Sequence, residues 1–129
     1  MSTTVTSPSA TRTTSATSPS AFRTATVIGT GLQLAMVIAG HWVQFIKLNV
    51  FAIGGTLISL MAAVIYARLA CVDRSGSAIR GALVGGLCAL IGIGVSFLLG
   101  DVTAGIFLIG TASSAIAGAV GGAMVGGGR

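Results

Sequence analysis

The chain has 129 residues, of which 53% are hydrophobic and 7% are charged, and its mean hydropathy is +1.00. Soluble domains carry about a quarter charged residues, so this composition excludes an ordinary water-soluble domain and favours a single membrane domain. The net charge of +5 comes from basic residues scattered beside apolar runs. That pattern is typical of membrane orientation and does not indicate a nucleic-acid-binding patch.

Residues 1–22 differ in composition from the rest, because Ser and Thr dominate and Arg12 is the only charged side chain. The pentapeptide Thr-Ser-Pro-Ser-Ala occurs twice, at residues 6–10 and 17–21. A segment with so little apolar surface to bury is predicted to be a disordered tail. It lacks the apolar centre of a secretory signal. Residues 1–26 have the composition of a cleaved transit peptide but no clear amphipathic Arg-bearing helix, so a cytoplasmic tail is the favoured interpretation.

Residues 23–129 are predicted to form one four-span transmembrane domain. A helix needs about 20 apolar residues to cross a bilayer, and the polar breaks place the spans at about 24–45, 50–70, 79–99 and 102–125. The breaks are a short turn at Lys47 and Asn49, a polar loop over 72–78 and a turn at Gly100-Asp101. The predicted fold class is therefore all-α, an integral membrane four-helix bundle.

The basic residues predict the orientation of this bundle. Four spans place the tail, the loop over 72–78 and the C-terminus on one side. That side carries six basic residues: Arg12, Arg23, Arg68, Arg74, Arg80 and Arg129. The opposite side has Lys47 alone. This bias predicts cytoplasmic N- and C-termini, and we expect the membrane to be the bacterial inner (plasma) membrane.

Small residues recur at four-residue spacing, which lets membrane helices approach closely. A hairpin turning at Asp101 would set Gly81 level with Gly122, Gly85 with Gly118, and Gly92 with Gly110. Because each four-residue step drifts about 40° around a helix, we expect Gly118 and Gly122 to face the third span, and Gly110 and Gly126 to face another helix or a second copy. The predicted packing residues are Gly81, Gly85, Gly110, Ser114, Gly118, Gly122 and Gly126.

The candidates for a polar site or pathway are few. Gln33, His41 and Gln44 give the first span a partly polar face, which in a bilayer normally points at protein or water. His41 could hold a proton or a metal ion, but it is the chain's single His and no carboxylate shares its helix, which favours an interfacial His. For Gln33 an interhelical hydrogen bond is favoured over contact with a substrate.

Asp101 is predicted on the same side as His41 and Lys47, so these three residues could form a small ionic cluster at an entrance. The favoured interpretation is simpler, because exposed ion pairs contribute under about 1 kcal/mol. In that interpretation Asp101 makes a turn and Lys47 extends towards the headgroups.

Cys71 and Cys88 are predicted to be ordinary packing residues on the reducing side, without a structural disulfide. Acylation of Cys71 is the alternative. The sequence offers no nucleophile beside a base, no paired carboxylates and no phosphate-binding loop. We therefore expect no enzymatic activity, no catalytic or metal-binding residues and no cofactor.

Three membrane-protein families of this size bear comparison. Small multidrug exporters carry a Glu in the first helix, and fluoride channels carry a Phe- and Thr-rich third helix; this chain has neither feature. Arg68, Asp73, Gly81 and Gly85 are similar to the signature of the mitochondrial inner-membrane translocase family over 18 residues. Both spacings are one residue longer here, and no function is carried over.

The sequence thus predicts a small, non-enzymatic accessory, scaffold or assembly subunit. Its expected partners are the lipid bilayer and either further copies of itself or a larger membrane complex, and not nucleic acid. The alternative is a small channel or transporter with Gln33, His41 and Gln44 along its path. Transport of charged solutes is disfavoured because no ionisable residue is predicted at mid-membrane.

Overall fold

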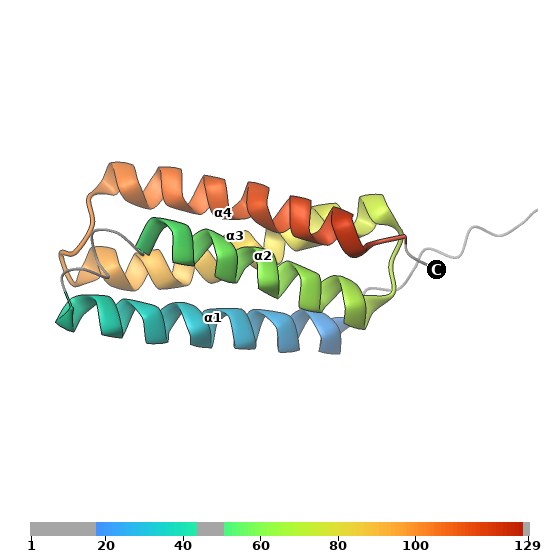
Figure 1. The fold of residues 1–129 in the computed structure, drawn as a ribbon, viewed down its shortest axis with the longest axis horizontal. Coiled ribbons are helices and arrows are strands. Elements are labelled where there is room, and N and C mark those ends of the chain that lie inside the picture. Colours follow the sequence, from blue (N-terminus) through green and yellow to red (C-terminus); the bar gives the residue numbers. More distant parts are fainter. Residues whose placement is uncertain (1–17, 44–50, 128–129) are drawn as a thin grey trace, which may run out of the picture.

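The computed structural model describes residues 18–43 and 51–127, which form four α-helices that run alternately up and down along one axis (Figure 1). These are α1 (Pro19–Trp42), α2 (Phe51–Ala70), α3 (Arg74–Leu98) and α4 (Ala104–Val125). Each contains a segment long and apolar enough to cross a membrane. The predicted all-helical architecture with four candidate spans is confirmed.

Two helices begin earlier than the sequence predicted. Pro19 opens α1, where its fixed φ suits the first turn and its missing N–H is not needed. Residues 19–22, assigned to the tail, are therefore helical, and residues 1–17 lie outside the described part. Asp73 caps α3 by accepting a hydrogen bond from the Gly76 N–H at 3.3 Å. Residues 74–78, predicted as loop, therefore form the first turn of α3.

The turn between α3 and α4 has a clear local cause. Gly100 has a φ of +74°, a left-handed conformation that glycine adopts without steric cost. The Asp101 N–H bonds to the Ser96 carbonyl at 2.9 Å and the Gly100 N–H to the Phe97 carbonyl at 3.0 Å. This is a Schellman motif, which ends a helix by satisfying its last carbonyls.

Helices α2 and α3 occupy the middle of the bundle, whereas α1 and α4 lie at opposite edges (Figure 1). Each edge helix packs on both central helices. Within the described residues α1 and α4 do not contact each other, and the α3–α4 contact is the most extensive.

The interior is lined by small residues, and large apolar side chains point outward. Ala25, Ala63 and Ala89 are fully buried, whereas Ile109 is 73% and Met124 71% exposed. Such a distribution would be unfavourable in water but suits a surface surrounded by hydrocarbon.

The contact between α3 and α4, here called the α3–α4 seam, brings two backbones together. Gly81 faces the Gly118 carbonyl and Gly122 faces the Ser77 carbonyl, while a Cβ on Gly85 would lie 2.7 Å from the Ser114 oxygen. Glycine is needed at these positions because any side chain would meet backbone atoms, which cannot rotate aside.

The seam is longer than predicted. A Cβ on Gly110 would lie 2.7 Å from Ile93 Cδ1, and one on Gly126 would lie 2.6 Å from Ser77 Cβ, so both glycines face α3 and not another helix. The positions they meet on α3 also lie on rows of four-residue spacing, so the two rows drift together around their helices. Of the three pairs expected at equal depth, Gly85 and Gly118 lie in contact. Gly81 meets Gly118 and not Gly122. Gly92 packs against Gln33 of α1, while Gly110 meets the neighbouring Ile93.

Candidate functional site

His41 and Asp101 meet at one end of the bundle, here called the His41 end. His41 lies in the last turn of α1 and Asp101 in the turn after α3, with His41 Nδ1 and Asp101 Oδ2 3.0 Å apart. The His41 side chain is 48% exposed and that of Asp101 13%. The structure thus brings these two candidates together, whereas Gln44 and Lys47 lie outside the described residues.

Gln33 lies in a different environment, at the centre of the bundle. Its side chain is buried, and its Nε2 donates to the Gly55 carbonyl at 3.2 Å and to Ser59 Oγ at 3.4 Å. Ser59 Oγ in turn donates to the Gly85 carbonyl at 3.2 Å. These bonds connect α1, α2 and α3 in one polar cluster, here called the Gln33 cluster.

Gln33 and His41 do not share a surface. They are eight residues apart, which corresponds to about 12 Å along a helix. Gln33 points at α2 and α3 inside the bundle, whereas His41 reaches the solvent-accessible end. The polar spacing on α1 therefore reflects two separate interactions.

A second buried polar contact joins α1 to α3. Thr30 Oγ1 donates to Cys88 Sγ at 3.8 Å, and Cys88 Sγ lies 3.6 Å from the Thr26 carbonyl that accepts its hydrogen. Cys88 is buried and Cys71 is exposed, and both are free thiols. The thiol lies directly against the backbone of α1, since a Cβ on Gly29 would be 2.6 Å from Cys88 Sγ.

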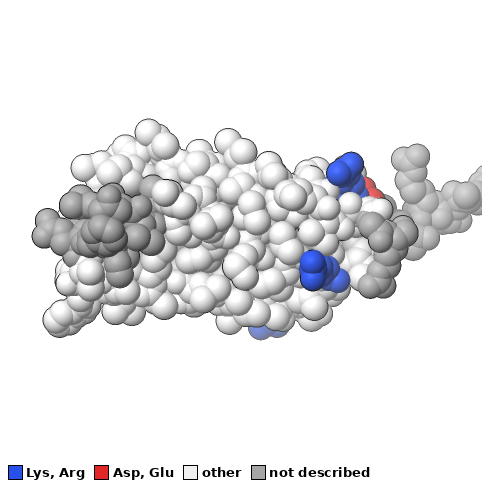
Figure 2. Space-filling model, in the orientation of Figure 1, with Lys and Arg blue, Asp and Glu red and all other residues white. Residues whose placement is uncertain are grey.

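The opposite end, here called the basic end, carries Arg23, Arg68, Arg74 and Arg80. On the face shown in Figure 2 the charged side chains gather at this end, and the described surface between the ends is uncharged. Arg74 Nε donates to the Ala123 carbonyl at 2.9 Å, and Arg80 to the buried Tyr66 hydroxyl at 3.3 Å.

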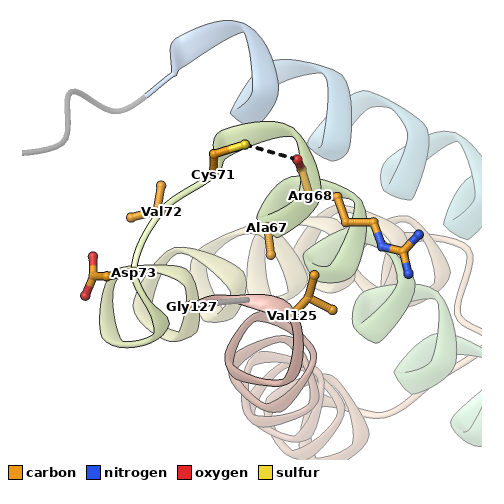
Figure 3. Close-up of a pocket in the computed structure, with 7 residues that line it drawn as sticks. All are labelled: Ala67, Arg68, Cys71, Val72, Asp73, Val125 and Gly127. Carbon is orange, nitrogen blue, oxygen red and sulfur yellow. Dashed lines mark hydrogen bonds between the residues drawn. The ribbon is translucent and has the colours of Figure 1, made fainter. Parts of the chain in front are cut away.

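A cavity of about 600 Å³ opens at the basic end (Figure 3). Its lining comes from the end of α2, the connection to α3 and the end of α4: Ala67, Arg68, Cys71, Val72, Asp73, Val125 and Gly127. The Arg68 side chain extends away from Asp73. The Ser75 hydroxyl and then the Gly76 N–H hold the pKa of Asp73 below its ordinary value. The contact with the Gly76 N–H is the helix-capping interaction, and the Ser75 hydroxyl bonds to the same carboxylate oxygen.

A wider groove of about 580 Å³ lies on the outer surface of α3 and α4 towards the His41 end. Its lining is apolar and includes Leu90, Phe97, Phe107 and Leu108. Among the described residues no three His, Cys, Asp or Glu side chains gather closely enough to hold a metal ion.

The sequence did not predict two polar contacts of the core. Cys88 was predicted to be an ordinary packing residue, yet Cys88 and Ser59 both provide buried polar partners for α1. Ser59 lies between Gly55 and Ala63 in a row of small residues, and Cys88 lies between Val84 and Gly92, so spacing alone did not indicate a polar contact. Only the relative rotation of three helices identifies them.

Comparisons of the chain with protein-family models, curated proteins and solved structures found no match. The function must therefore be argued from the geometry of the bundle itself.

Proposed function

We propose that this chain is a small integral membrane protein that acts as a non-enzymatic accessory, scaffold or assembly subunit. The observation that carries the proposal is the distribution of polar and apolar groups. Large apolar side chains cover the outside of all four helices. Near mid-length, the side-chain nitrogen of Gln33 and the hydroxyl of Ser59 donate to other helices of the same chain.

The exposed face of α1 supports an assembly role. Gly31, Ala35 and Ala39 are exposed at four-residue spacing, and no atom of the chain lies within 4 Å of a Cβ built on Gly31. Small residues allow close approach of another membrane helix. The helix they would receive belongs to a second copy or to a larger membrane complex.

Co-purification after cross-linking in intact membranes tests this role. Gly31→Leu should reduce recovery of the cross-linked assembly at least fivefold, because the large side chain prevents close approach. Ala112→Leu, at an exposed position of α4, is the matched control and should leave recovery unchanged. Equal recovery for both variants would argue against a docking role for this face.

The proposed orientation places the basic end in the cytoplasm of a bacterial cell, with the four helices crossing the inner membrane. The four arginines at that end support it, since basic residues are retained on the cytoplasmic side. Cys71 is an exposed thiol at the same end. A membrane-impermeant maleimide should therefore label Cys71 in inverted vesicles and not in intact spheroplasts. The reverse labelling pattern would place the basic end on the outer side of the membrane.

A channel or transporter remains the rival function, and its test is flux. Purified protein in liposomes should conduct no ion or small solute above the empty-liposome rate. If the purified protein does conduct and His41→Ala abolishes that conductance, the chain is a channel or transporter whose pathway includes the His41 end.

A further inference from the structure

The cavity of about 600 Å³ at the basic end is lined by one positive and one negative side chain. Among the described residues these are Arg68 and Asp73, and the Arg68 side chain extends away from Asp73 (Figure 3), so the two do not form an ion pair. The lining also includes the apolar residues Ala67, Val72 and Val125. Such a lining fits a ligand that has a positive and a negative group on one short stem.

The Asp73 side of the cavity can receive an ammonium group. The bonds from Ser75 and Gly76 both go to Asp73 Oδ2, and a carboxylate offers about four acceptor sites, so it can accept further bonds. The C-terminal ends of α2 and α4 also lie at the cavity, and such ends have unpaired carbonyls and partial negative charge. One cation already binds in this way, since Arg74 Nε donates to the Ala123 carbonyl of α4.

The Arg68 side of the cavity can receive a phosphate. Arg68 is exposed in the last turn of α2, and a guanidinium group presents paired N–H donors that match phosphate oxygens. Arg74 and Arg80 donate to partners within the chain. The Arg68 guanidinium, in contrast, has no hydrogen-bond partner among the described residues, so it is available to a ligand.

In the proposed membrane placement this cavity lies at the level of the lipid headgroups. It is formed where α2 ends at Ala70 and α3 begins at Arg74. Leu69 on α2 and Met124 on α4, each next in sequence to a lining residue, are 52% and 71% exposed. A headgroup in the cavity would therefore have apolar surface beside it for its acyl chains, and basic pockets between helices at this level bind phospholipid headgroups.

We propose that this cavity binds the headgroup of a zwitterionic phospholipid with a primary ammonium group, as in phosphatidylethanolamine. Arg68 binds the phosphate, while Asp73 and the carbonyl ends of α2 and α4 accept hydrogen bonds from the ammonium group. The proposal rests on the membrane placement proposed above, and it does not depend on the assembly role.

The labelling rate of Cys71 measures occupancy, because this exposed thiol lines the cavity. In detergent micelles, saturating phosphatidylethanolamine should slow maleimide labelling of Cys71 about tenfold, the effect expected of hydrogen bonds to charged groups. Phosphatidylglycerol lacks the ammonium group and phosphatidylcholine lacks N–H donors, so each should slow labelling less than about twofold. Cys88 is buried and reacts in a separate, slower phase. Equal protection by the three lipids overturns the proposal.

Two variants assign the two charged groups. Arg68→Gln should abolish protection by phosphatidylethanolamine, whereas Arg23→Gln should retain it, since Arg23 is exposed at the same end but does not line the cavity. Asp73→Asn keeps a capping side chain but removes the negative charge, so phosphatidylethanolamine and phosphatidylglycerol should protect it equally. Rates with and without lipid are compared within each variant, which cancels changes in the reactivity of the thiol itself. Protection that persists in Arg68→Gln, or selectivity that persists in Asp73→Asn, overturns the proposal.

Two further measurements identify the source of the headgroup. Glycerophosphoethanolamine has the same headgroup without acyl chains and should not protect Cys71 at the concentration of the lipid; equal protection would overturn the lipid site. Native mass spectrometry should find one phosphatidylethanolamine retained by the parent chain and by Arg23→Gln, and lost from Arg68→Gln. A parent chain that retains no such lipid also overturns the proposal.

These experiments in micelles are independent of the tests of the proposed function. Lipid exchange makes protection a slower rate and not a complete block, so Cys71 still reports the side of the membrane in vesicles. An empty cavity would leave the results on orientation and cross-linking unchanged, and a failure of either of those would leave the micelle result unchanged.

Discussion

The two edge helices are attached to the bundle by different physical means. In the middle of the α3–α4 seam the obstacles to any added atom are backbone atoms, such as the Gly118 carbonyl opposite Gly81. Only towards the ends of the seam, at Gly110 and Gly126, are the nearest obstacles side chains. On the other edge the contacts are made by side chains: Cys88 Sγ and Ala62 Cβ lie opposite Gly29 of α1, and the Gln33 side chain of α1 lies opposite Gly92 of α3.

The difference concerns how each contact can respond to change. A backbone-to-backbone seam gains dispersion contacts over its whole length, but it can relax only if an entire helix moves. A contact through side chains can adjust by rotation, and it adds hydrogen bonds such as those of Gln33 and Thr30. We therefore expect α4 to be held more rigidly, and α1 to tolerate more substitutions.

The largest expected effect is that of Gly118→Ala. Its Cβ would collide with the Gly81 carbonyl and approach Gly85 Cα at 3.2 Å, so the two helices must separate. Overpacking of this kind costs about 3 kcal/mol of unfolding free energy. In a Cys71→Ser background, the labelling rate of the buried Cys88 thiol in SDS mixed micelles measures the loss.

Gly105→Ala on the same helix is the control for that prediction. Only Thr103 Oγ1, at 4.0 Å, lies near its Cβ position, so the protein should keep or slightly gain stability. If Gly118→Ala were as well tolerated, the seam would not be a backbone contact.

The second prediction concerns α1. Gly29→Ala places a Cβ 2.6 Å from Cys88 Sγ and 2.8 Å from Ala62 Cβ. We expect a loss of about 1–2 kcal/mol, smaller than that of Gly118→Ala because side chains can shift. Adding Cys88→Ala should recover part of the loss, and SDS unfolding of the four chains of this double-mutant cycle measures the coupling.

No such second-site change should rescue Gly118→Ala, because the obstacle there is main-chain oxygen. If second-site changes rescue Gly118→Ala and Gly29→Ala to the same degree, or rescue neither, the two edge helices do not differ in how they are attached to the bundle.

The four helices could be predicted because length and hydropathy determine them, but their ends and rotations could not. Pro19 and Asp73 extend α1 and α3 beyond the apolar runs, since helix starts depend on local capping and not on hydropathy. Gly110 and Gly126 were assigned to a different neighbour because the prediction treated the partner helix as straight. Their actual partner, α3, follows the same four-residue drift.

Of the polar contacts, the one at the end of the bundle could be predicted from the sequence, and the one inside the bundle could not. His41 and Asp101 were both expected at one end of the bundle, since topology places them there, and they lie in contact. The partners of Gln33 depend on how α2 and α3 rotate towards α1. Sequence spacing does not contain that rotation, so Ser59 and Gly55 could not be named in advance.

The third prediction concerns the contact at the His41 end, which joins α1 to the α3–α4 turn. Asp101→Asn should lower the unfolding free energy by less than about 1 kcal/mol, because His41 is half exposed and such pairs are screened by solvent. SDS unfolding measures the change. His41→Gln should give a similar small loss in the parent chain and no further loss in the Asp101→Asn background. A loss as large as that of Gly118→Ala would mean that this pair, and not Gln33 or Cys88, holds α1 in place.

The smallest expected effect concerns Asp73, which caps α3 at the start of the seam. Its folded-state pKa lies below the ordinary value of 3.8, because the Ser75 hydroxyl and the Gly76 N–H bond to the carboxylate. A depressed pKa contributes stability that is present above pH 3.8 and is lost as the pH falls through the folded-state value. In an Asp101→Asn background, unfolding should thus be independent of this group between neutral pH and about pH 5, and become easier in more acidic solution. Asp73→Asn retains a capping side chain and should abolish that acid dependence, whereas Asp73→Ala should weaken the start of α3 at every pH. An acid response that persists unchanged in Asp73→Asn would show that the capping carboxylate is not its source.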